Sequence, residues 1–216
     1  MVGFLALGVS ACGGDDTNNN NNNTNTNNNN NNTNNNNNNT GCDYDTVAKV
    51  QAFLEGKTLV MNGENIPSHP NGFDRNINFG AATQCIYETK IEVVNNNFQV
   101  TTGFGTLSGA PNQGDVGTCD VNTKAAVADF QATSTGVLVE NTAADCSCFD
   151  VTVTYAGFTQ EGRAMISADG TEVDMELFFS GQATGHRCAD GAVGAATVTL
   201  NGAAFTGDAV QVYDVQ

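Results

Sequence analysis

From residue 86 onward, apolar and polar positions alternate along the chain with a period of two. Four runs of residues show this alternation. The residues predicted to share one face in each run are Tyr87, Thr89, Ile91 and Val93; Phe98, Val100, Thr102 and Phe104; Phe149, Val151, Val153 and Tyr155; and Val173, Met175, Leu177 and Phe179. Strict alternation is typical of strands that bury one face and expose the other. Asn95-Asn96-Asn97 and Asp169-Gly170 lie between apolar runs, and Gly157 to Gly162 offers a further turn. These turns predict hairpins, and therefore antiparallel strands.

A single helix precedes the strands. Val47, Val50, Phe53 and Leu54 recur at helical spacing, Asp45 is the predicted N-cap and Gly56 the predicted end. Shorter apolar runs add further strands around residues 59–61, 126–130, 137–139, 198–200 and 210–212. The predicted fold class is all-β: a meander of about eight to ten antiparallel strands, closed into a barrel or divided into a β-sandwich, with one short N-terminal helix.

The N-terminus has the pattern of an export signal. Residues 2–9 are apolar, and Val9-Ser10-Ala11-Cys12 follows them. These four positions resemble the lipobox of bacterial lipoproteins, which implies cleavage before Cys12 and lipid on that cysteine. Residues 1–11 are then the signal peptide. A signal normally begins with Lys or Arg, and because none precedes Cys12 we expect the true start to lie upstream.

Residues 12–40 are predicted to be a tether. Positions 17–40 contain 19 Asn and 5 Thr and no apolar side chain. Such a segment buries too little surface to offset the entropy lost on ordering, so we expect it to remain disordered. Self-association through Asn ladders is the alternative. The remaining chain, residues 41–216, is predicted to be a single all-β domain.

The cysteine count indicates disulfides. Without Cys12, six cysteines remain, at Cys42, Cys85, Cys119, Cys146, Cys148 and Cys188. An even number in an exported domain predicts three disulfides, with the connectivity left open. Cys146 and Cys148 face the same way in an extended chain and are expected to have different partners. A zinc site formed by Cys146, Cys148, His186 and Cys188 is the alternative; its spacing lacks the favoured Cys-x₂-Cys pattern, so no metal is expected.

Charge excludes several classes of partner. The chain has 23 Asp and Glu against 7 Lys and Arg, a formal net charge of −16. This sign opposes binding to nucleic acid or to a bare anionic membrane. No apolar run reaches the roughly 18 to 20 residues of a membrane-spanning helix.

The domain resembles the lipocalins in outline. The resemblance extends over residues 44–216. It rests on a short predicted helix, the segment Gly56-Lys57-Thr58 that follows it, and the consecutive predicted hairpins. The lipocalin Gly-x-Trp motif is incomplete, because Thr58 stands in the place of Trp, and no ligand-binding residue can be carried over. The whole layout also resembles surface lipoproteins of myxobacteria and their relatives, which implies a location at the outer membrane or cell surface.

Two predicted loops carry candidate ligand-binding residues. His69 and Arg75 belong to the segment 66–75, and His186 and Arg187 to the segment 181–190. In an acidic domain a His-Arg pair is a local positive site that could bind a carboxylate or sulfate. On this hypothesis His69 and His186 lie close together at one barrel mouth. The structural alternative is that Arg187 pairs with Asp190 or another acid and that His186 caps a loop.

The sequence contains no catalytic constellation that requires an enzyme. The preferred function is a lipid-anchored, non-catalytic binding module for a small molecule, glycan or peptide, monomeric and without a cofactor. A structural or adhesive surface protein is the second hypothesis. The third is a hydrolase that uses Glu161, Glu176 or an Asp with His186. An enclosed apolar pocket would favour the first hypothesis, a fully packed interior the second, and paired carboxylates in a cleft the third.

Overall fold

The computed structural model describes residues 42–63, 85–108, 118–200, 202–205 and 209–216. In chain order the elements are α1 (Val47–Leu54), β1 (Thr58–Asn62), β2 (Ile86–Val94), β3 (Asn97–Ser108), β4 (Thr118–Lys124), β5 (Phe130–Glu140), β6 (Phe149–Tyr155), β7 (Thr159–Ile166), β8 (Glu172–Phe179), β9 (Ala183–Thr184), β10 (Thr199–Leu200), β11 (Ala203–Ala204) and β12 (Val210–Val215).

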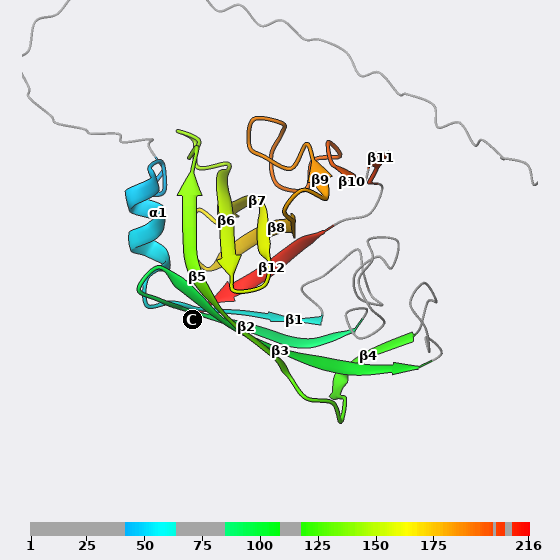
Figure 1. The fold of residues 1–216 in the computed structure, drawn as a ribbon. Helices are drawn as coiled ribbons and strands as arrows, with labels where there is room; N and C mark the ends of the chain where they lie inside the picture. Colours follow the sequence, from blue (N-terminus) through cyan, green and yellow to red (C-terminus); the bar gives the residue numbers. More distant parts are fainter. Residues whose placement is uncertain (1–41, 64–84, 109–117, 201, 206–208) are drawn as a thin grey trace, which may run out of the picture. The chain divides into compact units, whose positions relative to one another are not determined.

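Eight of these strands form a closed antiparallel barrel. The order around it is β1, β2, β3, β5, β6, β7, β8 and β12, and β12 pairs again with β1. Leu59 lies opposite Val215 where the barrel closes, and β4 extends the sheet beyond β3. The predicted antiparallel meander is confirmed, and of its two forms the structure has the barrel (Figure 1). Closure leaves the eight barrel strands without a free edge.

Helix α1 covers one end of the barrel, which we call the helix end. Thr46 caps α1 by accepting a hydrogen bond from the Lys49 amide, so the predicted cap at Asp45 is wrong by one residue; Asp45 pairs with the Lys49 ammonium instead. On the inner face of α1, Val50 and Leu54 are buried in the core of the barrel. The space between Leu54 and the barrel interior is only about 10 Å³. The helix end is therefore tightly packed.

The turns at the helix end are short and well capped. Asn95 and Asn96 both have positive φ, as a two-residue hairpin turn requires. Their amides donate to the Glu55 carboxylate at 2.7 and 2.9 Å, so the residue that follows α1 fixes the β2–β3 turn. The opposite end, where β6 ends at Tyr155 and β7 begins at Thr159, is here called the loop end.

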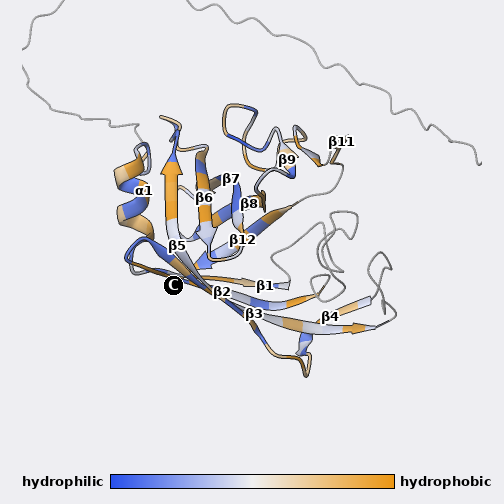
Figure 2. Ribbon diagram, in the orientation of Figure 1, coloured by the Kyte–Doolittle hydropathy of each residue, from blue (hydrophilic) through white to orange (hydrophobic). Residues whose placement is uncertain are grey.

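The hydropathy pattern along the strands agrees with the alternation in most places (Figure 2). Tyr87 is an exception: a bulge between Ile86 and Glu88 brings Ile86 to the inner face and takes Tyr87 off it. The segment 126–129 forms no strand, and β5 runs without interruption through residues 137–139. Within the described residues, no helix combines the length and apolar character needed to cross a membrane.

Three disulfides join the six predicted cysteines. The pairs are Cys42–Cys146, Cys85–Cys119 and Cys148–Cys188. The neighbouring pair Cys146 and Cys148 therefore has different partners, as expected. Cys42 fastens the start of the described domain to the β5–β6 connection, and Cys188 fastens the long β8–β12 connection to the start of β6.

The β8–β12 connection packs on the outside of the barrel. Its residues 180–200 are here called the outer segment, and they cover the outer face of β7 and β8. Phe178, Ala183, Val198 and Ala209 form a small second core beneath it. The domain thus has two buried regions, one inside the barrel and one between the barrel wall and the outer segment.

Candidate functional site

The barrel contains a partly open cavity of about 340 Å³ towards its loop end. Its walls come from seven barrel strands and from the β6–β7 turn. The lining residues are Ile86, Thr89, Ile91, Phe98, Val100, Thr102, Phe104, Phe130, Tyr155, Phe158, Gln160, Leu177, Phe179, Gln211 and Tyr213. No charged side chain is among them. The volume is at the lower end of the range of about 300 to 1,000 Å³ that small-molecule sites occupy.

The cavity exists because the two ends of the barrel are filled differently. At the helix end, α1 inserts Val50 and Leu54 against the core. At the loop end no described helix fills the interior, and the inward positions of the strands leave space between them. Side chains of an eight-stranded barrel can fill its interior or leave room for one small ligand. This barrel is filled in one half and open in the other.

Aromatic rings form much of the wall. Tyr155 and Phe158 stack across the β6–β7 turn with ring centroids 4.5 Å apart. Phe158 also meets Phe179 edge to face at 5.6 Å. Rings that pack on one another are held in place, so this part of the wall has a fixed shape in the absence of a ligand.

Six polar side chains line the cavity, and all are neutral. The Thr89 and Thr102 hydroxyls of β2 and β3 share a hydrogen bond of 3.0 Å. The Tyr213 hydroxyl donates to Gln211 Oε1 at 2.6 Å. The remaining polar residues are Tyr155 on β6 and Gln160 on β7. A few fixed polar groups in an apolar wall are typical of sites that orient a small molecule.

Two tyrosines report the low polarity of this interior. Burial raises the pKa of the Tyr155 hydroxyl to about 12. Burial also raises the pKa of Tyr213, with a smaller contribution from Tyr155. Both hydroxyls therefore remain protonated at neutral pH, and the cavity disfavours charge.

The residues predicted to bind a ligand do not line this cavity where the structure describes them. His69 and Arg75 lie outside the described residues. His186 and Arg187 belong to the outer segment, on the outer side of the barrel wall. The Arg187 guanidinium contacts Glu161 at 2.6 Å and Thr152 at 3.4 Å, and its backbone amide donates to Asp190. Arg187 is thus engaged in contacts that hold the outer segment to β6 and β7.

His186 is buried beside this ion pair. Its ring lies edge-on to Phe178 at 5.9 Å, and Nε2 is 4.0 Å from Glu161 Oε1. Neither ring nitrogen has a hydrogen-bond partner among the described residues. Burial lowers the pKa of His186, the charge of Arg187 adds to the shift, and Glu161 and Asp190 oppose it. The neutral imidazole therefore suits this environment.

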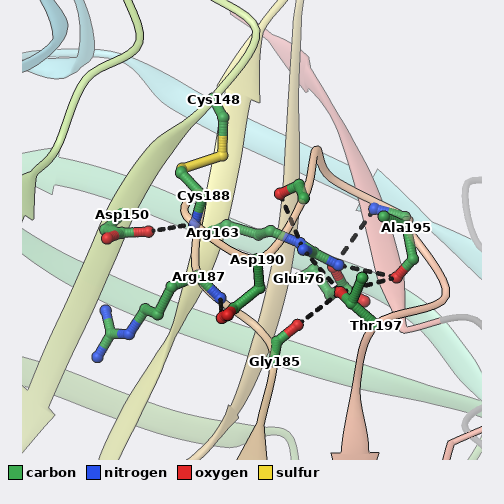
Figure 3. A network of polar contacts seen from close by, with 12 residues as sticks. Cys148, Asp150, Arg163, Glu176, Gly185, Arg187, Cys188, Asp190, Ala195 and Thr197 are labelled. Carbon is green, nitrogen blue, oxygen red and sulfur yellow. Dashed lines mark hydrogen bonds and ion pairs between the residues drawn. A yellow bond between two sulfur atoms is a disulfide. The ribbon is translucent and has the colours of Figure 1, made fainter.

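Arg163 organises the outer segment, and sequence reasoning gave it no role. It is fully buried, and its Nε donates to Glu176 Oε2 at 2.7 Å. Its remaining donors reach the backbone carbonyls of Gly191 and Ala195 and the Thr197 hydroxyl. Figure 3 shows these contacts converging on one guanidinium, with the Arg187 guanidinium pointing away from them. One arginine thus satisfies several polar groups that would otherwise be buried without partners.

The acids considered for a hydrolase are both paired with arginine. Glu176 pairs with Arg163, and Glu161 pairs with Arg187. Burial opposes the ionisation of Glu161, but hydrogen bonds from Ser180 and Gly181 and the charge of Arg187 outweigh it and lower the pKa. A carboxylate held ionised by a structural pair is a poor general acid. Neither glutamate lines the cavity.

Sequence reasoning expected a ligand at one end of the barrel but missed the residues that line the cavity, although part of their signal was present. Thr89 and Thr102 occupy inward positions of two alternating runs, where an apolar side chain is the default. Hydroxyls on the buried face of neighbouring strands indicate a polar group inside the barrel. Gln160 and Gln211 gave no such signal, because their runs were too short to assign a face.

Among the described residues, His, Cys, Asp and Glu side chains form no group of three that could hold a metal ion. No family model, curated protein or solved structure matches the chain. The geometry of the barrel is therefore the basis for assigning a function.

Proposed function

We propose that the protein is a lipid-anchored extracytoplasmic binding protein that holds a small, mostly apolar molecule inside its barrel. The observation that carries this proposal is the 340 Å³ cavity with its apolar, aromatic wall. An interior packed throughout would instead have favoured a structural or adhesive protein. The lipocalin resemblance supports the same function, since the eight-stranded barrels of lipocalins hold one small ligand.

The place of action is proposed from the sequence and the disulfides together. The lipobox-like Val9-Ser10-Ala11-Cys12 supports attachment to a membrane through lipid on Cys12. Three disulfides support an oxidising compartment, because they persist outside the reducing cytoplasm. An outer-membrane or cell-surface location is consistent with both.

The proposal is tested with an uncharged fluorescent probe. The full chain carrying Cys12→Ser, prepared with its three disulfides, is titrated with N-phenyl-1-naphthylamine, whose emission rises in an apolar environment. We expect saturable binding to one site per chain. Thr102→Phe places a ring in the cavity and should weaken binding by about tenfold or more, because an added side chain excludes the probe from a cavity near the minimum useful size.

The matched control is Thr101→Phe, the same change at the next residue of β3, which does not line the cavity. This variant should bind the probe as the unaltered chain does. If neither variant changes the binding, the probe lies elsewhere on the protein. Absence of saturable binding by the unaltered chain would contradict the proposed function.

A further inference from the structure

If the cavity binds a small molecule, as the proposed function states, the chemistry of its wall indicates which class of ligand it binds. We propose that the ligand is an uncharged molecule with a hydroxyl or carbonyl oxygen on an apolar body, and that the Gln160 and Gln211 amides bind this oxygen. A fatty alcohol or a neutral ester has this chemistry. A fatty acid anion or an alkylammonium does not.

No described cation can neutralise an anion in the cavity. Lys49, Lys90 and Lys124 pair with acids on the outside of the domain. Arg163 and Arg187 are paired with glutamates beneath the outer segment. The sixth described cation, Lys57, lies over the Phe53 ring. None of the six lines the cavity.

Charge of either sign is therefore unfavourable inside the barrel. A carboxylate moved into an apolar site without a counter-ion loses its hydration and gains no compensating interaction. An ammonium meets the same cost, since no carboxylate lines the cavity. The raised pKa values of Tyr155 and Tyr213 report the same low polarity.

The neutral polar groups favour an oxygen that accepts hydrogen bonds. Gln211 Oε1 already accepts from the Tyr213 hydroxyl, which leaves the Gln211 amide hydrogens without a partner among the described residues. Gln160 likewise has no hydrogen bond within the described part of the chain and lines the same cavity. Both glutamines are half-buried, and a ligand that displaces water from the cavity keeps their amide hydrogens paired only if it brings an acceptor. Hydroxyl and carbonyl oxygens both accept such bonds.

The test uses four compounds with the same decyl or decanoyl chain: 1-decanol, methyl decanoate, decanoate and decylamine. Each displaces N-phenyl-1-naphthylamine from the Cys12→Ser full chain at pH 8. We expect decanol and methyl decanoate to bind at least about tenfold more tightly than decanoate or decylamine, because only the last two bring an unpaired charge into the cavity. Methyl decanoate and decanoate share the carbonyl and differ in charge.

Two variants test the role of the glutamines. Gln160→Leu/Gln211→Leu should weaken decanol binding about three- to tenfold, the effect of losing one or two neutral hydrogen bonds, while the probe still binds. The control is Gln131→Leu, an exposed glutamine on β5, which should leave decanol binding unchanged.

The outcomes separate the two proposals. Decanoate binding as tightly as decanol would overturn the uncharged-ligand inference and leave the proposed function standing. If that binding were lost in Arg75→Gln, an anion site that includes Arg75 would replace the inference. Undiminished decanol binding by the double variant would overturn the role of the glutamines. A chain that binds neither the probe nor any of the four compounds would overturn the proposed function itself.

Discussion

At the scale of single residues, Arg163 shows how a buried charge can be a structural requirement. Its guanidinium is fully buried and is satisfied by Glu176 and by backbone carbonyls of the outer segment. Arginine suits this task because its planar fork presents five donors in fixed directions. The alternation of β7 directs Arg163 outwards, where the outer segment covers it.

Removing this arginine alone should be costly. Arg163→Met leaves Glu176 buried without a counter-charge, and we expect the free energy of unfolding to fall by about 3 to 5 kcal/mol. Urea denaturation measures the change. The double variant Arg163→Met/Glu176→Gln should lose less than the sum of the two single variants, because the second change removes the unpaired charge. Additive losses would show that the two side chains do not depend on each other.

His186 should make stability depend on pH. Its folded-state pKa lies below the ordinary value, chiefly through burial, so the unfolded chain binds the proton first as pH falls. The free energy of unfolding should therefore decrease from about pH 7 downwards, by at most about 1.4 kcal/mol per pH unit. His186→Phe should flatten the curve between about pH 7.5 and 5.5, above the range in which most carboxylates titrate.

The other histidine supplies the control for this pH dependence. His69→Phe should retain the slope of the unaltered chain, measured by urea denaturation at each pH. A slope that survives His186→Phe and disappears in His69→Phe would contradict the assignment.

At the scale of the elements, one glycine sets how closely two strands approach. A Cβ added at Gly162 on β7 would overlap the backbone carbonyl of Glu176 on β8. Backbone cannot move aside as a flexible side chain can. Such glycines occur where a barrel strand bends or another backbone comes close.

Gly162→Ala should therefore destabilise the barrel by about 1 to 3 kcal/mol, the usual cost of overpacking. Gly136→Ala on β5 is the matched control, since a Cβ there meets nothing within 4 Å. That control should be neutral or slightly stabilising, because alanine restricts the unfolded chain more than glycine does. Thermal unfolding of both variants distinguishes the cases, and equal losses would mean that glycine is needed at Gly162 for another reason.

Hydropathy alternation predicted the strands that have one apolar face, and it did not predict the strand that is polar on both faces. The runs from Phe98 and from Val173 have the predicted inner faces, because the burial of alternate side chains dictates the register. Strand β4 is polar on both faces, so periodicity gave no indication of it; pairing with β3 and the Cys85–Cys119 disulfide hold it in place. The bulge between Ile86 and Glu88 takes Tyr87 off the inner face of β2, and alternation alone does not predict a bulge.

The cavity was less predictable than the barrel. Its volume depends on which inward side chains meet across the interior, and the order of residues along one strand does not specify this. Gln160 and Gln211 are far apart in sequence and line one cavity only because β7, β8 and β12 are neighbours. The His186-Arg187 pair led to a predicted site in a loop, whereas the cavity lies inside the barrel.

At the scale of the whole molecule, the proposed anchor has a direct test. Cys12→Ser removes the proposed lipid site and leaves the six disulfide cysteines in place. Because stable membrane association of lipoproteins depends on the attached acyl chains, we expect the variant to leave the membrane fraction of bacterial cells that express it. Immunoblots of fractionated cells measure the change. Thr17→Ser is the control and should leave the protein with the membranes; membrane association of Cys12→Ser would contradict lipid attachment at this residue.

The pairing of β1 with β12 has a consequence for the order of events during biosynthesis. Leu59 meets Val215, so the first and last strands of the barrel must come together across nearly the whole domain. Contacts of such long sequence separation form slowly, since a large loop must close first. A chain emerging from its N-terminus cannot complete the barrel until β12 has emerged. Until then, β1 and β8 remain open edges that can pair with another chain, and the emerging domain depends on rapid completion or on a chaperone.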